Sequence, residues 1–148
     1  MSQDAPTIFL CYDPPDRVCA DKFADWPRTN ALAAAYDARV ETLFDRPAAE
    51  PLRAALRVQI RAADVTVCLI GEDTWRSPWI DWELRMSKES PRRNGLVGVV
   101  LQTYHPRPAA IENSGAIFVP FKRDAVARAI RWAATESYTQ DDFTLVDE

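Results

Sequence analysis

The sequence predicts a single α/β domain built on a flavodoxin-like open parallel sheet of about five strands, with helices on both faces. Three observations support this fold class. Short apolar runs alternate with segments of helical periodicity, which is the pattern of β-α-β crossovers. The central run VTVCLI is apolar throughout, as in a parallel strand that is covered on both faces. The length of 148 residues fits one domain.

The part of the chain up to residue 71 contains two predicted strands, two predicted helices and one ambiguous segment. The run TIFLCY at residues 7–12 is β-rich and bounded by prolines, which predicts a strand. A short helix is expected at about residues 18–26. Residues 32–44 are ambiguous, because their alanines favour helix while ARVETLF alternates as a strand would. Residues 48–63 carry apolar side chains at helical spacing, and residues 64–70 form the central strand, which ends at Gly71.

The rest of the chain predicts two more strands and two more helices. Ser77 and Pro78 are a favoured N-cap and a favoured first helical residue, so a helix is expected at about residues 79–89. GLVGVVL at residues 95–101 and IFVP at 117–120 predict strands, and residues 124–134 predict an amphipathic helix. We expect one domain over residues 1–148, with a core at about 7–134 and a frayed acidic tail at 139–148.

Composition and charge exclude several classes of function. The net charge of -4 gives no general attraction to nucleic acid. The N-terminus has no signal-peptide pattern and no segment is long and apolar enough to span a membrane, so a cytoplasmic protein is expected. Cys11 and Cys68 lie in apolar strand patterns and are expected to be small buried hydrophobes. No metal site is expected, because the cysteine spacings match no zinc pattern and His105 lies in a Pro-flanked loop without nearby partners.

Glu83 is the candidate catalytic residue. It follows Trp79 by four residues on the predicted helix, so the two side chains share one face of that helix. The helix follows the central strand, and open α/β folds bind ligands beyond the carboxyl ends of their strands. A carboxylate there could bond the hydroxyls of a ribose or stabilise the positive charge of an oxocarbenium-like transition state. The alternative is a solvated glutamate that the helix dipole favours in the first turns.

Aromatic side chains accompany this glutamate. Trp75, Trp79 and Trp82 fall within eight residues, and their planar rings suit a stacked adenine or nicotinamide base. The alternative is that two of these rings pack the helix onto the sheet, and this is the preferred interpretation for Trp82.

The loop after the first strand, residues 12–17, opens at the same edge of the predicted sheet. Asp13, Asp16 and Arg17 could line a pocket, with Arg17 facing a phosphate. Turn chemistry explains Asp13 and the two prolines equally well. Other enzyme patterns are absent from the sequence, since it has neither a glycine-rich phosphate loop nor a plausible Ser-His-Asp set.

The segment SPWIDWE at residues 77–83 resembles the S-x-W-C-x-x-E signature of TIR domains, with Ile80 where cysteine is common. The longer string DVTVCLIGEDTWRSPWIDWEL is similar to the TIR-like proteins of the bacterial Thoeris anti-phage system. The opening IFLCYDPPD resembles the first strand and the following loop of the same family. The resemblance covers about residues 7–134 and is most specific in the central third.

This resemblance implies a TIR-like fold and cleavage of NAD at the nicotinamide–ribose bond, with NAD as substrate and no separate cofactor. It implies Glu83 as the catalytic residue and a cyclic or modified ADP-ribose product that signals to an effector protein. It also implies self-association and a phage-derived trigger as controls of activity. The residues expected around the substrate are Tyr12, Asp13, Arg17, Trp75, Ser77 and Trp79. Two alternatives stay open: a non-catalytic TIR-like scaffold and a protein that binds a nucleotide messenger without cleaving it.

Overall fold

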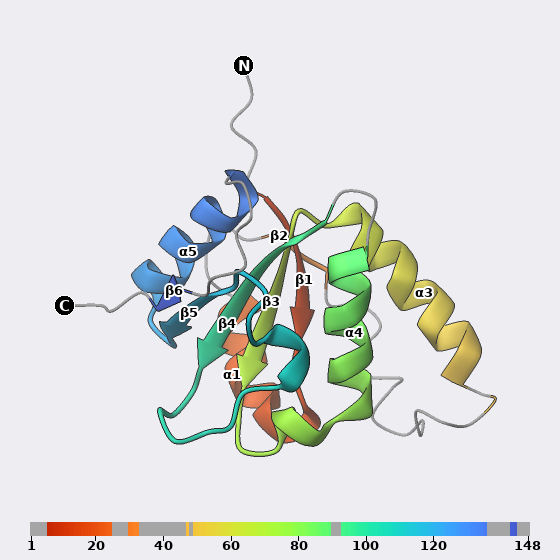
Figure 1. Ribbon diagram of the computed structural model, residues 1–148, viewed down its shortest axis with the longest axis horizontal. Helices are drawn as coiled ribbons and strands as arrows, with labels where there is room; N and C mark the ends of the chain where they lie inside the picture. Colours follow the sequence, from red (N-terminus) through yellow and green to blue (C-terminus); the bar gives the residue numbers. More distant parts are fainter. Residues whose placement is uncertain are drawn as a thin grey trace.

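A six-stranded parallel sheet forms the centre of the protein (Figure 1). The computed structural model describes residues 6–24, 30–32, 47, 49–89, 93–135 and 143–144. The strands lie in the order β2-β1-β3-β4-β5-β6. Their bounds are Thr7–Cys11 for β1, Asn30–Leu32 for β2, Val65–Ile70 for β3, Gly95–Val100 for β4, Ile117–Pro120 for β5 and Phe143–Thr144 for β6.

This strand order creates a switch point between β1 and β3. The chain leaves β1 toward β2 on one side and leaves β3 toward β4 on the other side, although β1 and β3 are paired neighbours. Loops that diverge in this way open a crevice beyond the ends of the two strands, where ligands of open α/β folds bind. We call the side of the sheet at which the strands end the carboxyl edge, and the opposite side the amino edge.

Helices cover both faces of the sheet, as predicted. In Figure 1, α3 and α4 lie to the right of the strands and α1 lies behind them. Helices α3 and α4 contact each other, and α5 packs on β4 and β5. The bounds are Arg17–Ala24 for α1, Ala49–Ala62 for α3, Pro78–Glu89 for α4 and Arg123–Thr135 for α5. Together with the parallel sheet, these helices confirm the predicted flavodoxin-like fold class.

The predicted elements agree closely with the structure where periodicity was clear. All six residues of β3 are buried, which is what a continuous apolar run in a covered central strand should give. Helix α4 begins at Pro78, and the Ile80 backbone N–H donates to the Ser77 Oγ at 3.3 Å, so Ser77 is the N-cap that the sequence indicated.

Two predictions differ from the structure. The second strand is Asn30–Leu32, which ends where the ambiguous segment at residues 32–44 begins, and residues 33–46 lie outside the described residues. The acidic tail was expected to fray from residue 139, but Phe143–Thr144 pairs in parallel with β5. The open edge of β5 offers unpaired backbone N–H and C=O groups, and β6 satisfies them. No helix in the described part of the chain combines the length and apolar character that crossing a membrane requires.

Candidate active site

Two loops meet at the switch point on the carboxyl edge. The loop after β1 contains the 3-10 turn Pro14–Asp16, and the loop after β3 contains the 3-10 turn Thr74–Arg76. The hydroxyl of Thr74 lies 3.5 Å from Asp16 Oδ2, which joins the two loops across 58 positions of sequence. The same hydroxyl accepts the Gly71 backbone N–H at 2.8 Å and lies 3.3 Å from the Leu69 carbonyl oxygen. The Thr74 side chain therefore links the loop after β1 to the end of β3.

Gly71 leaves room for the Asp16 carboxylate. A Cβ atom on Gly71 would overlap all three atoms of that carboxylate group in its present position. Asp16 therefore lies directly against the backbone at the end of β3. Asp16 was considered in the sequence as a pocket residue, and the structure shows what it contacts.

His105 brings a third loop to the same place. Its Nδ1 lies 3.1 Å from the Ile70 carbonyl oxygen, and its ring packs edge-on against Tyr104 with the centroids 4.7 Å apart. The sequence offered no nearby partner for His105, and the structure supplies one from a distant strand. The loop after β4 folds back over the end of β3, and a contact across 35 positions cannot be seen in the local sequence. Asp13, Asp16, Gly71, Thr74 and His105 are called the carboxyl-edge cluster below.

Burial raises the pKa of the Asp16 carboxyl, and the negative charge of Asp13 raises it further. His105 and the hydrogen bond from Thr74 act in the opposite direction. A raised pKa means that the folded protein holds the Asp16 charge less readily than the unfolded chain does. Ionised Asp16 therefore opposes folding at neutral pH, and this unfavourable contribution disappears as acid protonates the group in both states.

Replacing Asp16 by asparagine should stabilise the protein at neutral pH, because asparagine keeps an acceptor for Thr74 and carries no charge. The gain in unfolding free energy at pH 7 should not exceed about 1 kcal/mol, since solvent screens a half-buried group. The gain should shrink as the pH falls through the raised pKa and vanish below about pH 4. Urea unfolding of both proteins from pH 7 to pH 4 measures this difference. An advantage of Asp16→Asn that grows on acidification would contradict the assignment.

Glu83 lies in the middle of α4 and is fully buried, with 0% of its surface exposed. The alternative of a solvated glutamate in the first turns of the helix is therefore excluded. Ser77 at the carboxyl edge precedes it by six residues, or about 9 Å along the helix axis. The Glu83 side chain thus belongs to the buried face of α4, away from the end of the helix at the carboxyl edge.

The three tryptophans of this region separate into two environments. Trp79 is buried, and it meets Trp82 edge-on with the ring centroids 6.4 Å apart. The Arg57 guanidinium from α3 lies 5.6 Å from the centre of the Trp82 ring, so Trp82 has a packing role, but it contacts the neighbouring helix, whereas the preferred interpretation was packing of the helix onto the sheet. Trp75 is half exposed on the turn after β3. Of the three indole rings, Trp75 is the one that can receive a ligand without rearrangement of the core.

The predicted residues of the loop after β1 also differ in exposure. Tyr12 is buried at the end of β1, and Asp13 is half-buried beside it. Arg17 is exposed at the start of α1, where its Nε lies 3.4 Å from the Asp21 carboxylate. The structure thus brings Asp13 into the carboxyl-edge cluster, while Arg17 interacts along its own helix.

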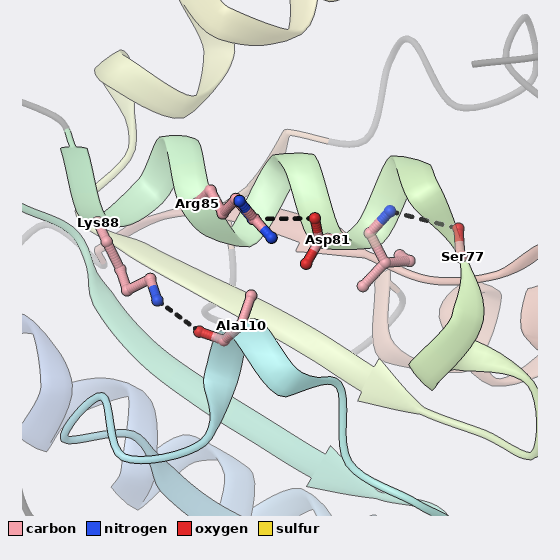
Figure 2. Close-up of polar contacts among 6 residues, drawn as sticks. Ser77, Asp81, Arg85, Lys88 and Ala110 are labelled. Atoms are coloured by element: carbon pink, nitrogen blue, oxygen red, sulfur yellow. Dashed lines mark hydrogen bonds and ion pairs between the residues drawn. The ribbon is translucent and has the colours of Figure 1, made fainter. Parts of the chain in front are cut away.

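A basic residue near the end of helix α4 contacts the turn that follows β4. The Lys88 Nζ donates to the Ala110 carbonyl oxygen at 2.7 Å, and Figure 2 shows this side chain reaching from α4 to the turn Ala109–Ile111. Burial lowers the Lys88 pKa, followed by the positive charges of Arg93 and Arg85. On the outer face of the helix, Arg85 pairs with Asp81 at 2.9 Å (Figure 2). The Lys88 contact thus joins the helix that carries Glu83 to the turn Ala109–Ile111.

Thiol and metal chemistry receive no support from the described residues. Cys11 and Cys68 are buried, as the strand pattern predicted. Burial raises the pKa of the Cys19 thiol, and the Asp16 charge raises it further, so this thiol stays protonated at neutral pH. Within the described ranges, no group of three or more His, Cys, Asp or Glu side chains is placed to hold a metal ion.

Sequence reasoning missed two members of the carboxyl-edge cluster. Thr74 had no motif to mark it, and its signal would have been its position three residues after Gly71, just beyond the end of β3. The only signal for His105 was its position shortly after a predicted strand. That position places its loop at the carboxyl edge but does not indicate which residue it contacts.

Comparison with known families identifies one match. The family described as Thoeris protein ThsB, TIR-like domain, matches residues 9–105, well over half of the chain. The matched part runs from β1 through α4 to His105, so it contains Glu83 and the whole carboxyl-edge cluster. No curated protein matches the chain.

Proposed function

This chain belongs to the TIR-like domain family of the Thoeris protein ThsB, and from that premise we propose that it cleaves NAD at the nicotinamide–ribose bond. Family membership gives it a TIR-domain role in anti-phage defence. The proposed product is a cyclic or otherwise modified ADP-ribose, which a separate effector protein senses as a messenger.

The observation that supports catalysis is the complete burial of the Glu83 side chain. Burying a carboxyl group is costly even when it has a partner, so stability alone does not explain a glutamate here. Electrostatic interactions are strongest where water is excluded, which is where a carboxylate best stabilises a developing positive charge.

In the proposed reaction the bond between ribose C1′ and the nicotinamide nitrogen breaks, and its electron pair neutralises the positively charged ring. Positive charge then develops at C1′, and the Glu83 carboxylate stabilises it. Water, or another nucleophilic atom of the ADP-ribose itself, bonds to C1′ and loses its proton. The first route gives linear ADP-ribose and the second gives a cyclic product.

The remaining proposed substrate contacts come from the carboxyl edge. Asp13 in the loop after β1 can accept hydrogen bonds from ribose hydroxyls, and the half-exposed Trp75 offers a stacking surface for a base. Because Glu83 is closed to solvent in the single chain, we propose that self-association or a phage-derived trigger opens the site.

A non-catalytic interaction module is the second candidate function. Three exposed apolar side chains belong to loops or helix starts that follow β1, β3 and β4: Val18, Trp75 and Tyr104. Apolar side chains that gather at one edge of a sheet are a common feature of protein-binding surfaces. This candidate predicts binding without NAD turnover.

Chromatography of NAD incubated with the purified chain distinguishes these functions. We expect nicotinamide release that rises more than proportionally with protein concentration or that appears on adding lysate of phage-infected cells. The accompanying product peak shows whether ADP-ribose is linear or cyclic. Absence of turnover under both conditions would contradict the enzyme and favour the interaction module, whereas tight binding of ADP-ribose without turnover would favour a messenger sensor.

A further inference from the structure

A buried chain of hydrogen bonds connects the body of the sheet to the backbone of Glu83. Its members are Asn94, Thr66 and Ser87, all of which are at most 1% exposed. The Thr66 and Ser87 hydroxyl oxygens are 2.6 Å apart, and the Ser87 hydroxyl donates to the Glu83 carbonyl oxygen at 2.9 Å. The Asn94 Nδ2 donates to Thr66 Oγ1 at 3.2 Å.

The direction of every bond in this chain follows from the available protons. Ser87 has one hydroxyl proton, which it donates to the Glu83 carbonyl, so Thr66 must donate to Ser87. Thr66 then accepts from the Asn94 amide, which also donates to the Ile60 carbonyl oxygen at 2.9 Å. Because both neighbours of Nδ2 are acceptors, the amide cannot be turned around. Each group therefore donates to the next, from the Asn94 amide through Thr66 and Ser87 to the Glu83 carbonyl oxygen.

The chain of hydrogen bonds is anchored in the centre of the sheet. Thr66 lies on β3 and is paired with Phe9 on β1 and Leu96 on β4. Asn94 precedes β4, and its backbone N–H donates to the Ser87 carbonyl oxygen at 3.1 Å near the end of α4. The network thus joins α4 to two central strands and to the end of α3.

Stability alone gives an incomplete account of this network. The Asn94 Oδ1 is buried and has no hydrogen-bond partner within the described residues. A buried acceptor without a partner is unfavourable, so the fold tolerates a cost while it keeps an amide at this position. Ser87 and Glu83 share a helix face, so a contact that holds Ser87 against β3 also sets the rotation and depth of the Glu83 side chain.

We propose that Thr66, Ser87 and Asn94 are positioning residues that hold Glu83 in its productive place, an inference that rests on the proposed NAD cleavage. They act through the Glu83 backbone and touch no substrate. A displacement of the carboxylate by about 1 Å is enough to lower the rate by about 100-fold.

The test compares Thr66→Val with Thr66→Ser. Valine keeps the shape of threonine and removes the hydroxyl, whereas serine keeps the hydroxyl and removes a methyl group. We expect Thr66→Val to lower kcat by about 10- to 100-fold with KM within twofold of the wild type. Thr66→Ser should retain kcat within about threefold, although it also loses buried surface. Val97→Ala, a buried truncation on β4 outside the chain, controls for lost stability at unchanged kcat.

Amide hydrogen exchange across α4 supplies a readout that does not depend on activity. Thr66→Val should increase exchange in Pro78–Glu89 by at least about tenfold while β4 stays protected, and Thr66→Ser should match the wild type. Equal kcat losses in the two Thr66 variants, or a change confined to KM, would overturn the positioning role. If the wild type cleaves no NAD, the proposed function is wrong, and the exchange experiment still tests the hydrogen-bond chain. Unchanged exchange in Thr66→Val would show that the chain does not anchor Glu83.

Discussion

Replacing Glu83 by glutamine should reduce nicotinamide release by at least about 1,000-fold, because the substitution removes the negative charge that stabilises the transition state. Glutamine has nearly the same shape and a similar helix propensity, so the fold should persist. The wild-type and variant proteins are compared by chromatography of NAD incubations, with circular dichroism and a melting curve for each. The melting temperature should stay within a few degrees or rise, since a buried charge is lost.

The matched control for this experiment is Glu89→Gln. Glu89 lies on the same helix and is exposed, so the variant makes the same chemical change without touching the buried site. It should cleave NAD at the wild-type rate. Turnover by Glu83→Gln above a tenth of the wild-type rate would remove Glu83 from the mechanism, and equal losses in both variants would indicate a general effect of charge.

Replacing Gly95 by alanine should destabilise the protein by about 3 kcal/mol, at the upper end of the usual cost of overpacking. Gly95 is the first residue of β4, and α5 crosses directly over it. A Cβ atom there would overlap the Ala133 carbonyl oxygen and lie 2.8 Å from both its carbonyl carbon and its Cβ. Those atoms belong to the helix itself, so the clash is relieved only if α5 moves away from the sheet.

Urea unfolding of Gly95→Ala measures this loss, and Gly71→Ala is the matched control. The added methyl group at Gly71 meets only the Asp16 carboxylate, which is the end of a half-buried side chain and can turn away. Gly71→Ala should therefore cost clearly less, and a second substitution, Asp16→Ala, should recover much of that cost. A smaller loss in Gly95→Ala than in Gly71→Ala would contradict the close packing of α5 on β4.

The agreement between sequence and structure is best where one element is specified by its own residues. The Ser77-Pro78 start of α4 and the continuous apolar run of β3 depend on local capping and on burial of every side chain. The second strand was harder to predict, because three residues at the edge of a sheet give too short a pattern to separate strand from helix.

Part of the candidate site was also predictable, because some of its residues lie close together in the sequence. Glu83, Trp79 and Ser77 lie on one helix within seven residues, and their spacing places Glu83 and Trp79 on a common face. The members of the carboxyl-edge cluster come from three loops, and no local spacing relates them. Arg17 was chosen by its residue type as a partner for a phosphate, and the structure adds that it lies 3.4 Å from the Asp21 carboxylate on the same helix.

The sequence by itself determined the α/β class, the bounds of the main helices, the resemblance to TIR-like domains and the choice of Glu83. These conclusions need only residue type and short-range periodicity. Only the tertiary structure decided that Glu83 is fully buried, that His105 reaches the end of β3, and that Thr66 and Asn94 connect to the helix of Glu83. Such contacts join residues 21 to 35 positions apart, and they form only after the crossovers have set the order and register of the strands.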